Sequence, residues 1–132
     1  MKHDVKNNYY LLSPGKLTVE NISYLLDNPI KIKLNKEIYN RVNHSRKLVI
    51  KAIDSKKTVY GINTGFGMLA NKCISQSDLH ELQKRIVLSH ATGTGKFLDI
   101  KTVQLIMLLK INSLSQGYSG ISEETLNVLI DM

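Results

Sequence analysis

The sequence of 132 residues contains a single cysteine, Cys73. One cysteine cannot form a disulfide within its own chain, and no second cysteine or nearby histidine completes a zinc-binding pattern. No apolar run approaches the roughly 18 residues that a transmembrane helix needs. The N-terminal residues lack the apolar stretch and the small-residue cleavage site of a secretory signal. We therefore expect a cytoplasmic protein with no metal and no membrane contact, and we interpret Cys73 as a small loop or core residue.

Clustered basic charge is also lacking, although the formal net charge is +7. The lysines are dispersed along the chain, and no basic block with interleaved aromatic residues matches a nucleic-acid-binding motif. We expect a solvated basic surface and no nucleic-acid partner. The hydrophobic content of 42% excludes a disordered chain, and the length fits one domain.

Hydrophobic spacing of three and four residues predicts a mainly α-helical fold. The segment IKIKL at 30–34 alternates apolar and basic residues and predicts a short strand, whereas residues 1–12 show no clear period. We expect helices to begin at the following N-cap residues: Thr18, Asn35, Ser75 or Ser77, Asp99 and Ser122. We expect these helices to end near Asn28, Ser55, Ala91 and Gly117, with the last one continuing towards Met132.

Two short glycine motifs fail on inspection. GTGK at 93–96 lacks the first glycine of a phosphate-binding loop, because His90 stands there, and Phe97 replaces the required serine or threonine. GFGMLA at 65–70 fits a dinucleotide fingerprint, but no strand precedes it and no long helix follows directly. We assign neither motif a function.

Three polar segments stand at the ends of expected helices. TVYGINTGFG at 58–67 places Tyr60 in a glycine-rich loop, VLSHATGTG at 87–95 places Ser89 and His90 at a helix end, and KINSLSQGYSG spans 110–120. A tyrosine can act as a general base if its pKa falls from about 10. The simpler interpretations are a surface packing role for Tyr60 and a favourable helix-dipole contact for His90. From these residues alone, both interpretations stay open.

The same segments, in this order and at this spacing, resemble the N-terminal part of the aromatic amino acid lyases. The resemblance runs from about Leu11 to the end of the chain, and it implies the N-terminal helical domain of that fold, with a short strand and a glycine loop. It implies that Tyr60 is the catalytic base and that His90 and Ser89 bind substrate. The residues that support the loop would be Gly61, Asn63, Gly65 and Gly67.

The pair Ser89-His90 is similar to the histidine-specific branch of this family. That likeness implies non-oxidative deamination of L-histidine to urocanate and ammonia, and a homotetramer when the protein is full length. It also implies a 4-methylidene-imidazol-5-one cofactor, which the family forms from an internal Ala-Ser-Gly. A tyrosine or phenylalanine ammonia-lyase, or an aminomutase, is the alternative within the same family.

No Ala-Ser-Gly occurs among the 132 residues, and the string nearest to it is YSG at 118–120. We therefore expect residues 1–132 to be an incomplete lyase domain that lacks the central helical bundle and is inactive alone. The apolar faces of residues 100–114 and 126–130 would be left uncovered, which predicts poor solution behaviour. The alternative is a stand-alone, non-catalytic relative that binds a ligand or a lyase subunit.

Overall fold

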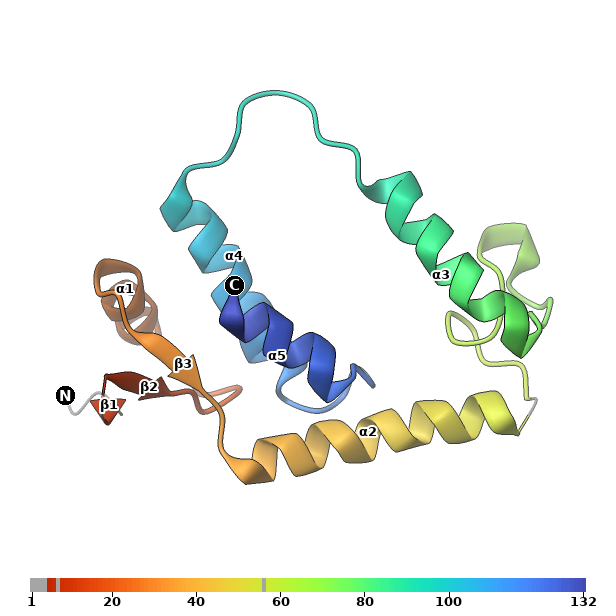
Figure 1. Cartoon of the computed structure of the whole chain (residues 1–132), viewed down its shortest axis with the longest axis horizontal. Coiled ribbons are helices and arrows are strands. Elements are labelled where there is room, and N and C mark those ends of the chain that lie inside the picture. The colour runs from red at the N-terminus through yellow and green to blue at the C-terminus, as the bar shows by residue number, and fades with distance from the viewer. Residues whose placement is uncertain (1–4, 7, 56) are drawn as a thin grey trace. The chain divides into compact units, whose positions relative to one another are not determined.

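A computed structural model describes residues 5–6, 8–55 and 57–132 (Figure 1). The fold is mainly α-helical, as the sequence predicts. Its elements in chain order are β1 (Val5–Lys6), β2 (Tyr9–Leu11), α1 (Val19–Asp27), β3 (Lys31–Lys33), α2 (Lys36–Asp54), the 3₁₀ helix η1 (Gly67–Leu69), α3 (Gln76–His90), α4 (Ile100–Leu114) and α5 (Glu123–Asp131).

The chain divides into two compact units. The first unit comprises Met1–Lys47 and Leu98–Met132, and the second comprises Leu48–Phe97. Helix α2 begins in the first unit and ends in the second. The single domain expected from the length stays a prediction, and each unit is described by itself below.

The predicted N-caps are confirmed by side-chain hydrogen bonds. Thr18 accepts from the backbone N–H of Asn21 and completes a capping box, which fixes the start of α1. Of the two candidate serines before α3, Ser75 is the cap. At the start of α4, hydrogen bonds from Thr102 lower the pKa of the Asp99 carboxyl below its usual value. These contacts satisfy backbone N–H groups that a helix start leaves without an intrahelical partner.

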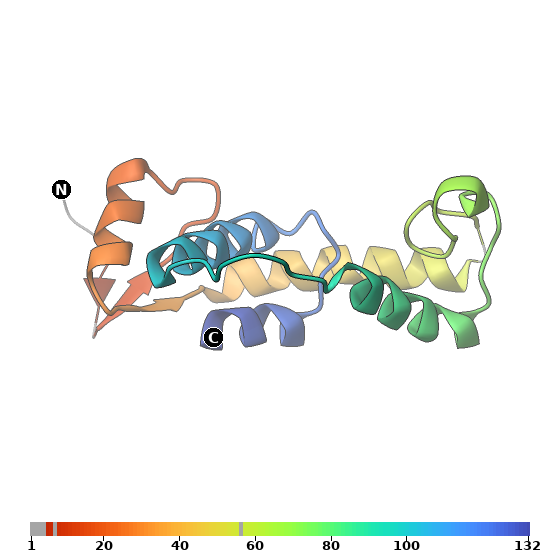
Figure 2. The same cartoon turned by 90° about the horizontal axis from the view of Figure 1, so that it is seen from above.

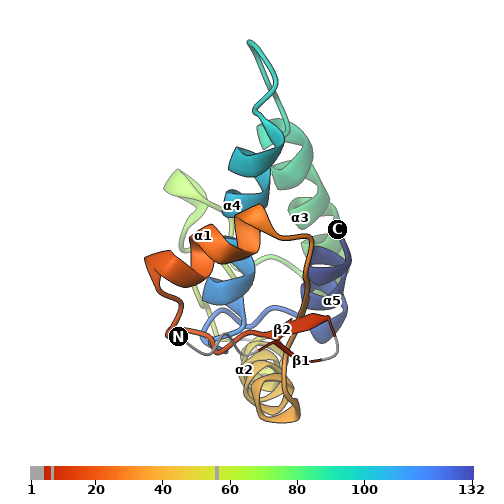
Figure 3. The ribbon, with the colours of Figure 1, turned by 90° about the vertical axis from the view of Figure 1, so that its left-hand side faces the viewer.

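A small three-stranded sheet in the first unit has the order β1-β2-β3. Strand β2 pairs antiparallel with β1 and parallel with β3, with Tyr10 opposite Ile32. Helix α1 is the crossover that the parallel pair requires (Figure 3). The sequence indicated β3 but gave no signal for β1 and β2, because strands of two or three residues are too short to show a period. Residues 1–4 and 7 lie outside the described residues.

The core of the first unit lies where α4 packs beside α5 and contacts α1 (Figure 2). Its buried members come from β2 and the residue that follows it, and from α2, α4 and α5: Tyr10, Leu12, Ile38, Val42, Ile111 and Leu126. Ile100 and Val103, at the start of α4, are exposed, in keeping with the uncovered apolar face expected on residues 100–114, whereas Ile111 on the same helix is buried. Ile106 and Leu109, also on α4, are exposed as well, so this helix carries apolar side chains on more than its packed face.

Gly117 stands at a crowded turn after α4, and Gly117→Ala is expected to weaken the first unit. Its φ is +81°, and an added Cβ would lie 3.0 Å from the Cβ and 3.1 Å from the carbonyl carbon of Arg41. We expect a cost of about 1–3 kcal/mol, measured as faster amide hydrogen exchange around Arg41. Gly15→Ala is the matched control, since its φ is +80° but only the end of the Gln116 side chain lies near. Equal exchange in the two variants would contradict the role of crowding.

No helix in the described part of the chain is both long and apolar enough to cross a membrane. Across residues 5–6, 8–55 and 57–132, the side chains of histidine, cysteine, aspartate and glutamate form no group of three or more that could hold a metal ion.

Candidate active site

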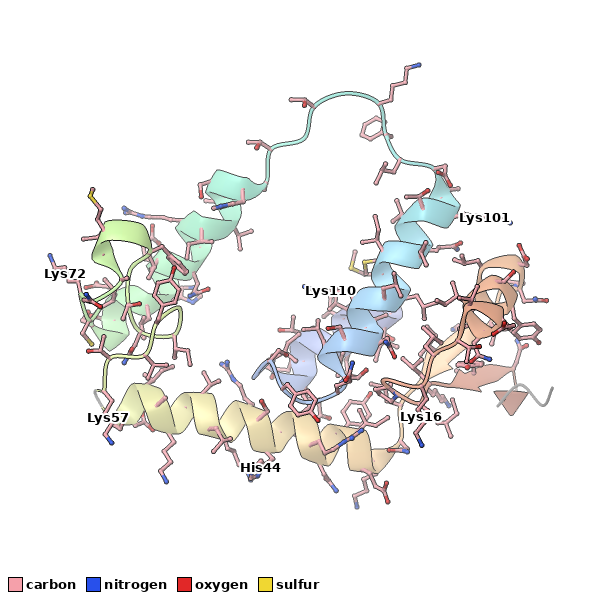
Figure 4. All side chains as sticks on the ribbon, turned by 180° about the vertical axis from the view of Figure 1, so that it is seen from behind. Lys16, His44, Lys57, Lys72, Lys101 and Lys110 are labelled. Atoms are coloured by element: carbon pink, nitrogen blue, oxygen red, sulfur yellow. The ribbon has the colours of Figure 1, made fainter. Side chains whose placement is uncertain are left out.

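The glycine-rich segment forms an irregular loop in the second unit, between α2 and α3. Lys57 precedes the loop and Lys72 lies within it, as Figure 4 shows. Gly61 and Gly67 have φ values of +73° and +58°. These values lie in the left-handed region that glycine adopts without steric cost, which explains why the chain is glycine-rich here. The segment GFGMLA folds into the short helix η1 and leads into further loop, so the dinucleotide fingerprint has no structural counterpart.

Asn63 holds the loop together from inside. Its side chain is 2% exposed, accepts a hydrogen bond from the Val59 N–H at 2.8 Å and donates to the Lys57 carbonyl oxygen at 2.8 Å. Its own carbonyl accepts from the Ile74 N–H at 2.9 Å. The side-chain amide of Asn63 therefore binds the start of the loop at Lys57 and Val59, and its backbone carbonyl binds the end of the loop at Ile74. These hydrogen bonds lie within the loop, and the supporting role expected for Asn63 in the site stays a prediction.

Thr64 is a second supporting residue, which the sequence analysis did not single out. Its side chain is buried, accepts from the Gly61 N–H at 3.2 Å and donates to the Gly65 carbonyl oxygen at 2.9 Å. At Gly65 an added Cβ would lie 2.6 Å from the Cβ of Leu69, so only glycine fits. The signal available in the sequence was a hydroxyl residue between Asn63 and glycine, because such residues often bond to the backbone of their own turn.

Tyr60 lies on the outside of this scaffold. Its side chain is 63% exposed, and its ring packs edge-to-face against Phe66, with ring centroids 5.9 Å apart and planes at 70°. Phe66 is therefore another residue of the loop that the sequence analysis passed over. The buried amide and hydroxyl fix the backbone on both sides of Tyr60, while its phenol stays accessible to a ligand.

Ser89 and His90 lie in the last turn of α3, where the sequence placed them. The Ser89 hydroxyl donates to the Ile86 carbonyl oxygen at 2.9 Å, and His90 Nδ1 lies 2.8 Å from the same oxygen. Ser89 Oγ and His90 Nδ1 are 3.0 Å apart. Both side chains are exposed. Helix α3 ends at His90, and the second glycine-rich segment begins at its C-cap, Ala91.

The two parts of the candidate site belong to one unit, but within the described residues no hydrogen bond or ring contact joins them. Ser89 and His90 bond within α3, and the ring partner of Tyr60 is Phe66. A cavity of about 530 Å³ in the same unit is lined by another set of residues: Ile53, Asp54, Asn63, Cys73, Ile74, Ser75 and Leu79. Cys73 is a free, exposed thiol, in keeping with a loop position.

Comparison with known proteins gives a consistent result. Histidine ammonia-lyase of Legionella pneumophila (strain Paris) is 52% identical over 122 residues, which are 92% of this chain and 24% of that protein. The enzyme of Shewanella oneidensis is 47% identical over 125 residues, again 24% of its length. The chain therefore spans about a quarter of the curated relatives that it matches, at their N-terminal part.

Solved structures show the same fold. Phenylalanine aminomutase of Pantoea agglomerans matches with a TM-score of 0.83 and 33% identity, over 92% of this chain and 24% of that one. Histidine ammonia-lyase of Trypanosoma cruzi matches with a TM-score of 0.76 and 30% identity, over 86% and 22%. The sequence model of the aromatic amino acid lyases covers residues 17–132. The chain belongs to the aromatic amino acid lyase family.

Proposed function

We propose that this chain is the N-terminal segment of a histidine ammonia-lyase, which converts L-histidine to urocanate and ammonia. The observation that carries the proposal is the 52% identity with the Legionella pneumophila enzyme over 92% of the chain. The loop geometry agrees with it, because a buried scaffold holds Tyr60 while its phenol stays exposed. In this proposal Tyr60 is the base, and Ser89 and His90 contact the substrate.

The reaction explains the demand for a base in a defined position. Loss of ammonia from L-histidine requires removal of a weakly acidic proton from the β-carbon. A tyrosinate is a stronger base than a carboxylate or a neutral imidazole, because the pKa of tyrosine is about 10. Its phenol must be ionised and aimed at that proton for general base catalysis. In this proposal, the loop that Asn63 and Thr64 hold together directs the Tyr60 phenol towards that proton.

The electrophile of the family does not fit the residues present. The 4-methylidene-imidazol-5-one ring is made from Ala-Ser-Gly, and these 132 residues contain no such tripeptide. The cofactor therefore has to come from sequence outside them. What this chain can contribute is the base at Tyr60 and the polar contacts at Ser89 and His90.

We expect the isolated chain to form no urocanate from L-histidine and a chimera to form it. In the chimera, residues 1–132 of this chain replace the matching first part of the Legionella pneumophila enzyme, which supplies the remaining three quarters. Urocanate is followed by its ultraviolet absorbance, and the unaltered Legionella enzyme is the positive control. Urocanate formed by the isolated chain would overturn the expected inactivity. A folded but inactive chimera would overturn the proposed function.

A second candidate within the family rests on the Pantoea agglomerans match, a phenylalanine aminomutase at 33% identity. Two chimeras distinguish the candidates, one completed by the rest of the Legionella pneumophila enzyme and one by the rest of the Pantoea agglomerans enzyme, each assayed with L-histidine, L-phenylalanine and L-tyrosine. An aminomutase would give a β-amino acid, and a lyase would give free ammonia. The higher identity to histidine ammonia-lyases favours L-histidine.

We also infer that the full-length protein is a cytoplasmic homotetramer and that the rest of the lyase covers the apolar side chains exposed on α4. These are Ile100, Val103, Ile106 and Leu109. Exposed apolar groups concentrated on one helix are typical of a surface that another part of the protein covers.

A further inference from the structure

The last turn of α3 contains a closed set of three polar atoms: the Ile86 carbonyl oxygen, Ser89 Oγ and His90 Nδ1. The three separations are 2.9, 2.8 and 3.0 Å. All three are hydrogen-bond distances. The atoms come from one helix turn within one unit, so their arrangement depends on no contact elsewhere in the protein.

This arrangement favours one protonation pattern in a neutral imidazole. A carbonyl oxygen only accepts, so His90 Nδ1 must carry the proton that it donates to Ile86. The Ser89 hydroxyl also donates to the Ile86 oxygen, so its lone pairs are left to accept from the same Nδ1–H. With the proton on Nε2 instead, the lone pair of Nδ1 would face the carbonyl oxygen at 2.8 Å. Nε2 is then the unprotonated nitrogen.

We propose that Ser89 is a positioning residue that keeps His90 as the Nδ1–H tautomer, so that Nε2 meets the substrate as a hydrogen-bond acceptor. The matching ligand group is an N–H donor, such as a protonated imidazole nitrogen or an ammonium group. The statement that His90 meets substrate rests on the proposed function. The tautomer itself rests on the three distances in α3.

In a purely structural role, Ser89 and His90 would act only on the end of their own helix and not on a ligand. In that case His90 would only satisfy a carbonyl of the last turn, as basic residues often do there, and either nitrogen could serve. Two features go beyond that role. Ser89 provides a second acceptor for the same proton, and the exposed ring leaves Nε2 open to a ligand.

The test is long-range ¹H–¹⁵N NMR of the 132-residue chain, which reports the protonation of each histidine nitrogen above the imidazole pKa. A His90→Gln variant assigns the His90 signals, and His80, exposed on the same helix, is the internal reference. We expect Nε2 of His90 to show the shift of an unprotonated nitrogen. Ser89→Ala should lower the ratio of the Nδ1–H to the Nε2–H form roughly fivefold, the effect of one hydrogen bond. Ser89→Thr, which keeps the hydroxyl, should restore it.

Two results would contradict the positioning role of Ser89. If His90 shows the same tautomer mixture as His80, or if Ser89→Ala leaves the ratio unchanged, the positioning role is wrong. A loss of α3 in Ser89→Ala would appear in its backbone shifts, and the Ser89→Thr variant then decides. Because the measurement involves no catalysis, its failure leaves the lyase proposal standing, and an inactive chimera leaves the tautomer assignment standing.

Discussion

Tyr60→Phe is expected to lower the kcat/KM of the chimera for L-histidine by roughly 10²–10⁴-fold, the range that a positioned acid or base contributes. The substitution removes one oxygen atom and keeps the ring. The edge-to-face contact with Phe66 is between the two rings, which the substitution keeps, so the loop should keep its conformation. Steady-state assays of urocanate formation measure the loss. A fall in kcat with little change in KM would indicate that the hydroxyl acts in the transition state.

The matched control is Tyr9→Phe, which removes the same atom from a tyrosine of the first unit whose ring lies under the Lys33 ammonium group. Its activity should stay close to that of the unaltered chimera. If Tyr60→Phe is as active as Tyr9→Phe, Tyr60 is a surface aromatic residue and the base lies elsewhere. If both variants lose activity, the loss reflects general damage to the fold.

Helix starts were predictable because each depends on one side chain and a local spacing. Thr18, Ser75, Asp99 and Ser122 each accept from a backbone N–H three residues later, so sequence alone contains the information. Which face of a helix is buried depends on neighbours distant in sequence. The uncovered apolar face expected on residues 100–114 is therefore found at Ile100 and Val103, whereas Ile111 is buried in the core of the first unit.

In the candidate site, too, some features could be predicted from local sequence and others could not. The resemblance identified Tyr60, Ser89 and His90 because it rests on short strings that sequence comparison detects. The contacts around Tyr60 were less predictable. Thr64 and Phe66 act through the turn geometry of a glycine loop, where φ values near +60° decide which atoms meet. Nothing in the periodicity of the sequence encodes such a turn.

Asn63→Ala is expected to release the loop that presents Tyr60. The substitution removes both partners supplied by one buried amide, and leaves the Val59 N–H and the Lys57 carbonyl without them. The two lost hydrogen bonds are partly buried, and at about 0.5–1.5 kcal/mol each they contribute about 1–3 kcal/mol together. When the loop is open, Tyr60 does not reach its catalytic position. The same free-energy cost then lowers the kcat/KM of the chimera roughly 10- to 100-fold. Amide hydrogen exchange across residues 57–75 should rise by a similar factor.

Asn71→Ala is the control for this prediction, because Asn71 lies in the same loop with an exposed side chain. Both variants lose an amide of the same size, so any difference reflects the buried hydrogen bonds of Asn63 and not composition. Faster exchange in Asn63→Ala without loss of activity would separate the scaffold from catalysis. Loss of activity without faster exchange would mean that Asn63 touches the substrate directly. The expected result, both effects together and neither in Asn71→Ala, would show that the loop acts by holding Tyr60 in place.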